Sequence, residues 1–151
     1  KLALKGLNKI IPKDLNPENK ERLTNNFDAS ITYSRQIGNI YTGSLYLGLL
    51  SLLEQSQDLK AGDKIGFFSY GSGAVSEIFS GRLVEGYKDL LRSDRLDTFA
   101  KRQPLSVADY EKLFYEEAQL DDTGSTQFAD YQTGAFRLAE ISEHQRIYKG
   151  N

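Results

Sequence analysis

The segment SRQIGNIYTGSLYLGLLSLLEQS, residues 34–56, limits the fold most, because it predicts a helix that is apolar on almost every side. The apolar residues of this helix are Leu45, Tyr46, Leu47, Leu49, Leu50, Leu52 and Leu53. A helix of this kind is stable when other elements surround it. Gly43, Ser44 and Gly48 would let a neighbouring backbone approach closely. We therefore expect this helix to be buried inside a layered structure.

Three other segments carry helix signals. KLALKGLNKII has helical periodicity and ends at Pro12. Asn16 can cap a helix in which Pro17 takes the first position, and the apolar periodicity continues to about Tyr33. Ser106 can cap a further helix, with Asp109 where a glutamate would complete a capping box.

Strand patterns fill much of the remaining sequence. KIGFFSY and AVSEIFSGRLV predict two strands joined by a short turn at Gly71–Gly73. AFRLAEIS and QRIYKG predict a second antiparallel pair that turns around Glu143. The polar residues 119–134 between these regions are typical of a mobile surface loop. Helices layered on a sheet indicate an α/β fold.

The composition excludes several classes of protein. With 151 residues, of which 39% are hydrophobic, the chain suits one soluble domain. A net charge of −2 gives no electrostatic footprint for nucleic acid, and no apolar run is long enough to span a membrane. The chain contains no Cys and one His, so we expect no disulfide, no thiol nucleophile and no metal site, as fits a cytoplasmic protein. It also contains no Met and begins within a helical pattern, which we interpret as a piece of a longer protein.

The stretch FFSYGSGAVSEIF places Ser72 directly between Gly71 and Gly73. This spacing differs from a nucleophile elbow, and neither a dinucleotide loop nor a P-loop continues from it. The turn could simply join two strands. Alternatively, its backbone N–H groups could bind a developing oxyanion, with the glycines at positive φ.

Asn39 precedes the apolar helix and has two possible roles. Its side chain could cap the first turn of that helix, or its amide could donate a hydrogen bond to a substrate carbonyl. Spacing alone favours capping. His144 is expected to be an exposed turn residue, and Asp121 and Asp122 are expected to lie in a solvated loop rather than in a cation site.

Three longer segments carry a resemblance to a known family. YSRQIGNIYTGSLYLGLLSLLE, AGDKIGFFSYGSGAVSEIFSGRLVEGYKDLL and LSVADYEKLF resemble the C-terminal part of bacterial 3-hydroxy-3-methylglutaryl-coenzyme A synthases. The resemblance covers about residues 1–114, and the last loop and hairpin agree more loosely. It implies the C-terminal half of a thiolase-like fold, with helices layered on a mixed sheet, over residues 1–151. It also implies an acyltransferase that condenses acetyl-CoA with acetoacetyl-CoA in the mevalonate pathway of isoprenoid biosynthesis.

The resemblance assigns supporting roles to residues of this chain. Asn39 matches an asparagine that hydrogen-bonds the acetoacetyl group, and Tyr41 matches a tyrosine beside the reaction centre. Ser72 matches a serine whose backbone N–H binds the thioester oxygen, so Gly71–Gly73 would form an oxyanion turn. Lys1 falls in a lysine-bearing stretch near the CoA entrance, although Leu2 stands where relatives often carry another lysine.

The nucleophilic cysteine, the acid/base glutamate and the substrate-binding histidine of the family are expected in the N-terminal remainder of the same chain. This chain alone is therefore predicted to be inactive. The family uses coenzyme A thioesters as substrates and needs no cofactor, and we expect a homodimer when the chain is complete. The alternatives are a freestanding thiolase-like binding or assembly module, and a polyketide β-branching relative that acts on carrier-protein-bound substrates.

Overall fold

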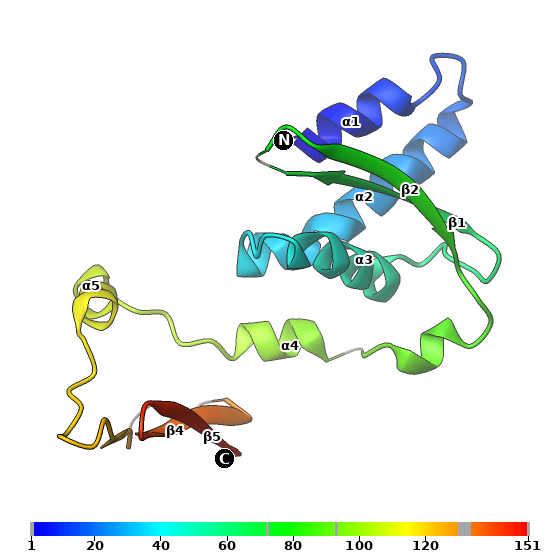
Figure 1. Cartoon of the computed structure of the whole chain (residues 1–151). Coiled ribbons are helices and arrows are strands. Elements are labelled where there is room, and N and C mark those ends of the chain that lie inside the picture. Colours follow the sequence, from blue (N-terminus) through cyan, green and yellow to red (C-terminus); the bar gives the residue numbers. More distant parts are fainter. Residues whose placement is uncertain (1, 72, 93, 130–133, 151) are drawn as a thin grey trace. The chain divides into compact units, whose positions relative to one another are not determined.

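The computed structural model describes residues 2–71, 73–92, 94–129 and 134–150. The chain groups into two compact units, residues 1–94 and 95–151. Each unit has its own sheet and its own helices (Figure 1), and the expectation of one domain stays a prediction.

The first unit contains helices α1 (Leu2–Ile10), α2 (Pro17–Ile37) and α3 (Gly43–Gln55). The predicted cap of α2 is confirmed, because the Asn16 side chain accepts a hydrogen bond from the Asn19 N–H at 2.8 Å. The helix runs past the predicted end to Ile37, since the first residue suited to stop it is Gly38 at a φ of 88°.

Helices α2 and α3 pack closely through small residues. A Cβ on Gly48 would lie 3.4 Å from the Ser30 backbone oxygen, so the glycine permits the predicted close approach. The fully buried Ser51 hydroxyl accepts from the Tyr33 N–H at 3.2 Å and donates to the Ala29 carbonyl at 2.6 Å. These are the two groups that would bond each other in a regular helix, so α3 is fixed directly to the backbone of α2.

A polar network continues from this contact. The Tyr33 hydroxyl, on a ring that is only 1% exposed, donates to Glu54 Oε2 at 2.6 Å. Gln55 Nε2 donates to the same hydroxyl at 3.1 Å. The other oxygen of Glu54 accepts from the Arg92 N–H at 3.0 Å. The network joins α2, the end of α3 and the segment that follows the short helix η1 (Tyr87–Leu90).

A β-hairpin completes the first unit. Strands β1 (Lys64–Tyr70) and β2 (Ser76–Arg82) pair antiparallel as predicted, with Phe67 opposite Phe79 and their rings stacked 4.8 Å apart. Leu52, Leu59 and Ile65 form the buried apolar cluster between this hairpin and α3.

The prediction that α3 is buried is only partly confirmed. Ser51 and Leu52 are buried, whereas Tyr46, one helical turn and a half earlier, is 62% exposed. The leucines of α3 other than Leu52 are half-buried, in both halves of the helix, so the described elements of the first unit enclose it only in part.

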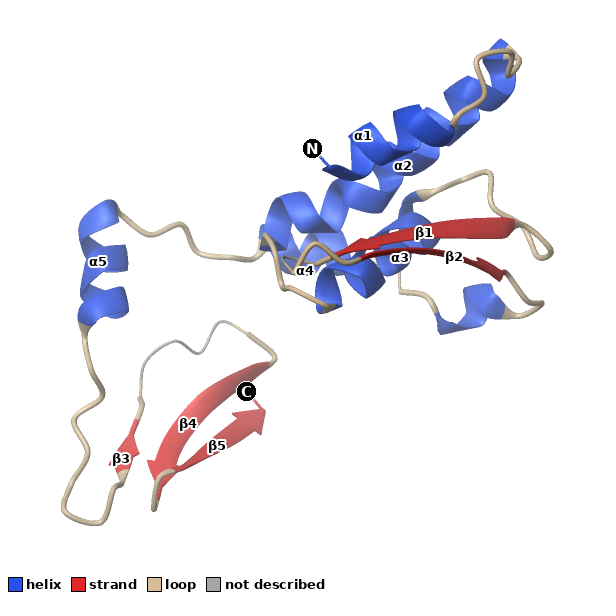
Figure 2. Cartoon of the chain, turned by 45° about the horizontal axis from the view of Figure 1, so that its top comes forward, coloured by secondary structure: helices blue, strands red, loops and turns tan. Residues whose placement is uncertain are grey.

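The second unit contains α4 (Arg95–Ala100), α5 (Val107–Tyr115), β3 (Thr126–Gln127), β4 (Phe136–Ser142) and β5 (Gln145–Gly150). The strands form one antiparallel sheet in the order β3-β4-β5, which Figure 2 shows in red. Ser106 caps α5 as predicted, because its hydroxyl accepts from the Asp109 N–H at 3.1 Å. The predicted turn between β4 and β5 consists of Glu143 and His144, both at positive φ.

The α/β class is confirmed, but the described strands do not form one mixed sheet. All of their pairings are antiparallel, in a two-stranded and a three-stranded sheet. A mixed sheet needs a parallel neighbour, and strands of this chain that follow each other through tight turns can only pair antiparallel. Over the same described ranges, no helix is long and apolar enough to cross a membrane.

Candidate functional site in the loop before α3

The loop between α2 and α3 is organised around the side chain of Asn39. Its Oδ1 atom accepts two hydrogen bonds, from the Tyr41 N–H and from the Ser44 hydroxyl, each at 2.9 Å. Ser44 Oγ in turn accepts from the Ile40 N–H at 2.9 Å. The side-chain oxygen is therefore committed to the fold of the loop.

This arrangement fixes the orientation of the Asn39 amide. A backbone N–H can only donate, so the atom facing the Tyr41 N–H must be the oxygen and not the nitrogen. No hydrogen bond from Asn39 Nδ2 to any other described residue is present, and Asn39 is exposed. The amide thus presents two N–H donors to its surroundings.

The hypothesis that Asn39 caps α3 is wrong. The N-cap residue is Thr42, and neither its side chain nor that of Asn39 accepts a bond from the first turn's backbone, as far as the structure is described. The chain turns sharply at Tyr41, with a φ of 56°, before the helix begins at Gly43. Asn39 therefore stabilises the turn ahead of the helix, which spacing alone could not distinguish from a cap.

Tyr41 follows in the same loop and presents its ring outward. Its side chain is 87% exposed, and its positive φ is uncommon for an aromatic residue. A left-handed backbone costs about 1–2 kcal/mol for a residue with a Cβ. The bond from its N–H to Asn39 helps to hold this conformation.

The hairpin turn after β1 lies at the same end of the first unit as the start of α3 (Figure 1). It is closed by bonds from the Gly71 N–H to the Val75 oxygen at 2.9 Å and from the Ala74 N–H to the Gly71 oxygen at 3.1 Å. Ser72 and Lys1, two of the predicted site residues, lie outside the described residues.

The expectation that Gly71 or Gly73 holds a positive φ is wrong. Among the described residues of this turn, the one at positive φ is Ala74, at 57°. A Cβ on Gly73 would meet no atom within 4 Å, and one on Gly71 would make ordinary contact at 3.8 Å. Neither glycine is required here by its φ or by local crowding within the described residues.

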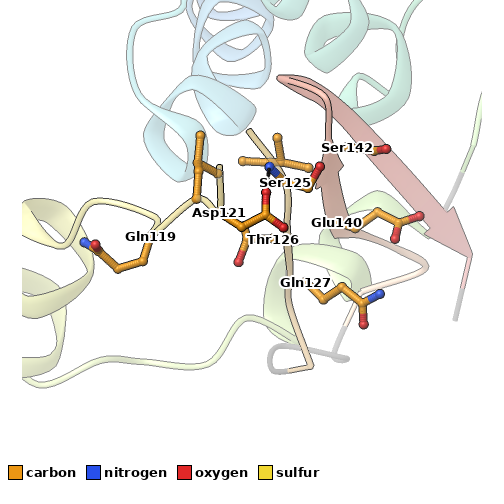
Figure 3. A pocket seen from close by; sticks show the side chains of 9 residues that line it. Gln119, Asp121, Ser125, Thr126, Gln127, Glu140 and Ser142 are labelled. Atoms are coloured by element: carbon orange, nitrogen blue, oxygen red, sulfur yellow. Dashed lines mark hydrogen bonds between the residues drawn. The ribbon is translucent and has the colours of Figure 1, made fainter. Parts of the chain in front are cut away.

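A groove in the second unit contains acidic residues but uses them for structure (Figure 3). The Asp121 carboxylate accepts from the Thr123 hydroxyl at 2.6 Å and from the N–H groups of Thr123 and Ser125 at 2.9 Å each. These bonds, that from the Thr123 hydroxyl first, lower the pKa of Asp121 below its usual range. Glu140, also on the groove, pairs with Lys149 at 3.4 Å. Among the described residues, both carboxylates of the groove thus take part in structural contacts.

The loop that contains this groove is more ordered than the sequence indicated. Residues 121–125 form a hydrogen-bonded turn, and β3 follows it, because the Asp121 side chain replaces backbone partners. Among the described residues no group of three or more His, Asp or Glu could hold a metal ion, and the expectation that Asp121 and Asp122 form no cation site stays a prediction. His144 is an exposed turn residue, as predicted, and its N–H donates to the Gly124 oxygen at 3.0 Å.

Solved structures identify the class of fold first. A crystal structure described as HMG_CoA synthase complexed with CoA superposes with a TM-score of 0.83 at 64% identity, covering 99% of this chain and 39% of that one. The HMG synthase of the curacin biosynthetic pathway, solved with an acetyl donor-ACP, gives a TM-score of 0.62 at 28% identity and covers 82% and 33%. The fold is therefore that of the thiolase-like synthases, as the resemblance implied.

Sequence comparison then identifies the family. Residues 5–149 match the family described as hydroxymethylglutaryl-coenzyme A synthase C terminal, and the chain belongs to it. The hydroxymethylglutaryl-CoA synthase of Enterococcus faecalis is 52% identical over 103 residues, which are 68% of this chain and 27% of that protein. The chain thus spans between a quarter and two fifths of the length of these relatives.

Proposed function

We propose that this chain is the C-terminal part of a hydroxymethylglutaryl-CoA synthase, which condenses acetyl-CoA with acetoacetyl-CoA in the mevalonate pathway. The observation that carries the proposal is the geometry of Asn39 in a member of this family. Two donors occupy its side-chain oxygen, so the amide nitrogen is directed outward from an exposed loop. This orientation leaves the amide N–H groups free to donate to an acetoacetyl carbonyl.

The chemistry explains why such a donor would matter. When the acetyl carbanion adds to the ketone of acetoacetyl-CoA, negative charge develops on the ketone oxygen. An amide N–H aimed at that oxygen stabilises the charge without having to reorganise. In this proposal Asn39 supplies the donor, Tyr41 lies beside the reaction centre, and the Ser72 N–H assists in binding the thioester oxygen. The roles of Ser72 and of Lys1 near the CoA entrance stay predictions.

The remainder of the machinery comes from elsewhere in the proposed full-length enzyme. The nucleophilic cysteine lies in the N-terminal remainder in this proposal, since this chain has no Cys. The acid/base glutamate and the histidine are assigned to the same remainder by the family resemblance. The substrates carry their own coenzyme A, so no separate cofactor is needed. We further propose a cytoplasmic homodimer for the complete protein, following the family resemblance.

A second candidate is the carrier-protein-dependent reaction of the polyketide relatives. The curacin synthase, solved with an acyl-carrier protein, shares the fold at 28% identity, whereas the structure with CoA shares it at 64%. The higher identity supports free coenzyme A thioesters as the substrates. A freestanding binding module is the third candidate, and the match of residues 5–149 to the synthase family supports the enzyme instead.

The test compares two purified proteins, the full-length enzyme and the chain of residues 1–151. The full-length enzyme is expected to form hydroxymethylglutaryl-CoA from acetyl-CoA and acetoacetyl-CoA, and the short chain is expected to form none. Product from the short chain would contradict the assignment of the nucleophile to the remainder. Turnover with carrier-protein-bound acetoacetate but not with acetoacetyl-CoA would favour the second candidate.

A further inference from the structure

We infer that Ser44 is a positioning residue that orients the Asn39 amide for the condensation step. The inference rests on the proposed function, since it assumes that Asn39 donates to substrate. Its basis is the position of the Ser44 hydroxyl, which lies between the Ile40 N–H and Asn39 Oδ1 at 2.9 Å from each.

The hydrogen-bond partners of the Ser44 hydroxyl fix the direction of its own hydrogen. Because the Ile40 N–H donates to Ser44 Oγ, the hydroxyl uses a lone pair there and turns its own hydrogen toward Asn39 Oδ1. With the Tyr41 N–H as the second donor, both acceptor positions of the Asn39 oxygen are filled. Rotating the amide by half a turn would place its NH₂ group against the Tyr41 N–H, so the observed orientation is strongly preferred.

Ser44 also connects Asn39 to the rigid part of the first unit. It belongs to α3, whose other end is fixed to α2 through the buried Ser51 hydroxyl. The Ser44 residue is half-buried, and within the described residues the hydrogen bonds of its hydroxyl go to the preceding loop rather than to its own helix. The hydrogen bond from the Ser44 hydroxyl therefore holds the Asn39 amide in a fixed position relative to α3, as supporting hydrogen bonds do for catalytic groups.

The kinetic test uses the full-length synthase, with Ser44→Ala, Ser44→Thr and Asn39→Ala alone and in combination. Formation of the acetyl-enzyme is the reference step, because Asn39 is assigned to the second substrate. Losing one neutral hydrogen bond is expected to lower the ratio of condensation to acetylation by roughly 3- to 10-fold in Ser44→Ala. Ser44→Thr retains the hydroxyl and should recover most of that ratio. Ser142→Ala, at an exposed serine of the second unit, is the matched control.

The double variant separates positioning from general damage. If Ser44 acts through Asn39, then Ser44→Ala should cause no further loss once Asn39 is Ala. An equal loss in both backgrounds, or a parallel loss of acetylation and condensation, would overturn the inference. A wild-type enzyme without condensation activity would instead overturn the proposed function.

A crystal structure of the Ser44→Ala full-length protein tests the orientation without reference to activity. The Asn39 oxygen is expected to keep the bond from the Tyr41 N–H but to lose its second donor, so that Nδ2 occupies more than one position. An Asn39 Nδ2 that stays in the single wild-type position would overturn the inference, even if turnover fell.

Discussion

Two loops of this molecule are held by the same type of side-chain hydrogen bonding but offer different groups to their surroundings. In the first unit, Asn39 Oδ1 accepts from the N–H two residues ahead and from a hydroxyl, both at 2.9 Å. In the second unit, Asp121 Oδ1 accepts from the N–H two residues ahead at 2.9 Å and from a hydroxyl at 2.6 Å. Both are turns in which a side-chain oxygen replaces a backbone acceptor.

The difference lies in what remains after the turn is made. A carboxylate carries only acceptors, so Asp121 has no donor to offer. An amide can accept the hydrogen bonds of the turn with its oxygen and still have two N–H donors, which is the situation of Asn39. The loop that can stabilise developing negative charge is therefore the one built on the amide.

The first prediction gives the Asn39 loop the same side chain as the Asp121 loop. Asn39→Asp keeps the acceptors of the turn but removes the donor, and Asn39→Ala removes both. In the full-length synthase each change is expected to slow condensation by about 10²- to 10³-fold, or about 2.7–4 kcal/mol of barrier. The measurement is steady-state turnover with acetoacetyl-CoA, together with thermal melting.

Melting separates the two roles of Asn39. Asn39→Asp should melt close to the wild type, and Asn39→Ala somewhat earlier, because only the second loses the turn. Full turnover in Asn39→Asp would show that the amide donor has no part in the reaction.

The second prediction concerns the network of Tyr33 and Glu54 in the first unit. The described hydrogen bonds of the Asp121 side chain are all exposed and include no such network. Tyr33→Phe removes the donor to the Glu54 carboxylate from a ring that is 1% exposed. Hydrogen bonds to charged groups contribute about 1.5–3 kcal/mol, and the free energy of unfolding should fall by that amount. Urea titration measures it, with Tyr148→Phe, at a ring 64% exposed, as the matched control. Equal losses in both variants would mean that the network adds no stability.

The third prediction uses Ala74, a residue at positive φ that no side-chain acceptor supports among the described contacts. Ala74→Gly is expected to stabilise the protein by up to about 1 kcal/mol, since removing the left-handed strain outweighs the added freedom of the unfolded chain. Gly73→Val is the contrasting variant, and its backbone φ gives no reason for strain. Urea titration checks both, and a destabilised Ala74→Gly protein would contradict the assignment of strain to position 74.

The smallest effect is expected at Asp121 and depends on pH. Its pKa is lowered in the folded chain by the bond from the Thr123 hydroxyl and by backbone N–H groups. The stability that it contributes is complete above the ordinary value of 3.8 and is lost as the pH falls through the lowered folded value. Asp121→Asn keeps an acceptor and should remove this dependence. Hydrogen exchange at the Thr123 and Ser125 amides measures it, and an unchanged pH profile in the variant would contradict the prediction.

The sequence by itself determined the features that depend on neighbouring residues. The caps at Asn16 and Ser106 and the hairpin from β1 to β2 follow from side chains and turns within a few positions. Local hydrogen bonds and strand alternation depend on residues that are close in sequence, so the sequence pattern predicts them. The motifs around Asn39 were also sufficient to indicate the family.

Only the tertiary structure decided which way the Asn39 amide points and where the strained residue of the hairpin turn lies. The orientation of the Asn39 amide depends on Ser44, which lies five residues later and contacts Asn39 because α3 begins there. In the hairpin turn, the positive φ falls on Ala74 although two glycines are nearby. Burial of α3 was likewise decided by what packs against it: within the described residues Ser51 and Leu52 are buried and Tyr46 is exposed. Orientation and burial are set by where distant groups meet in space, and the spacing of residues along the chain does not specify that meeting.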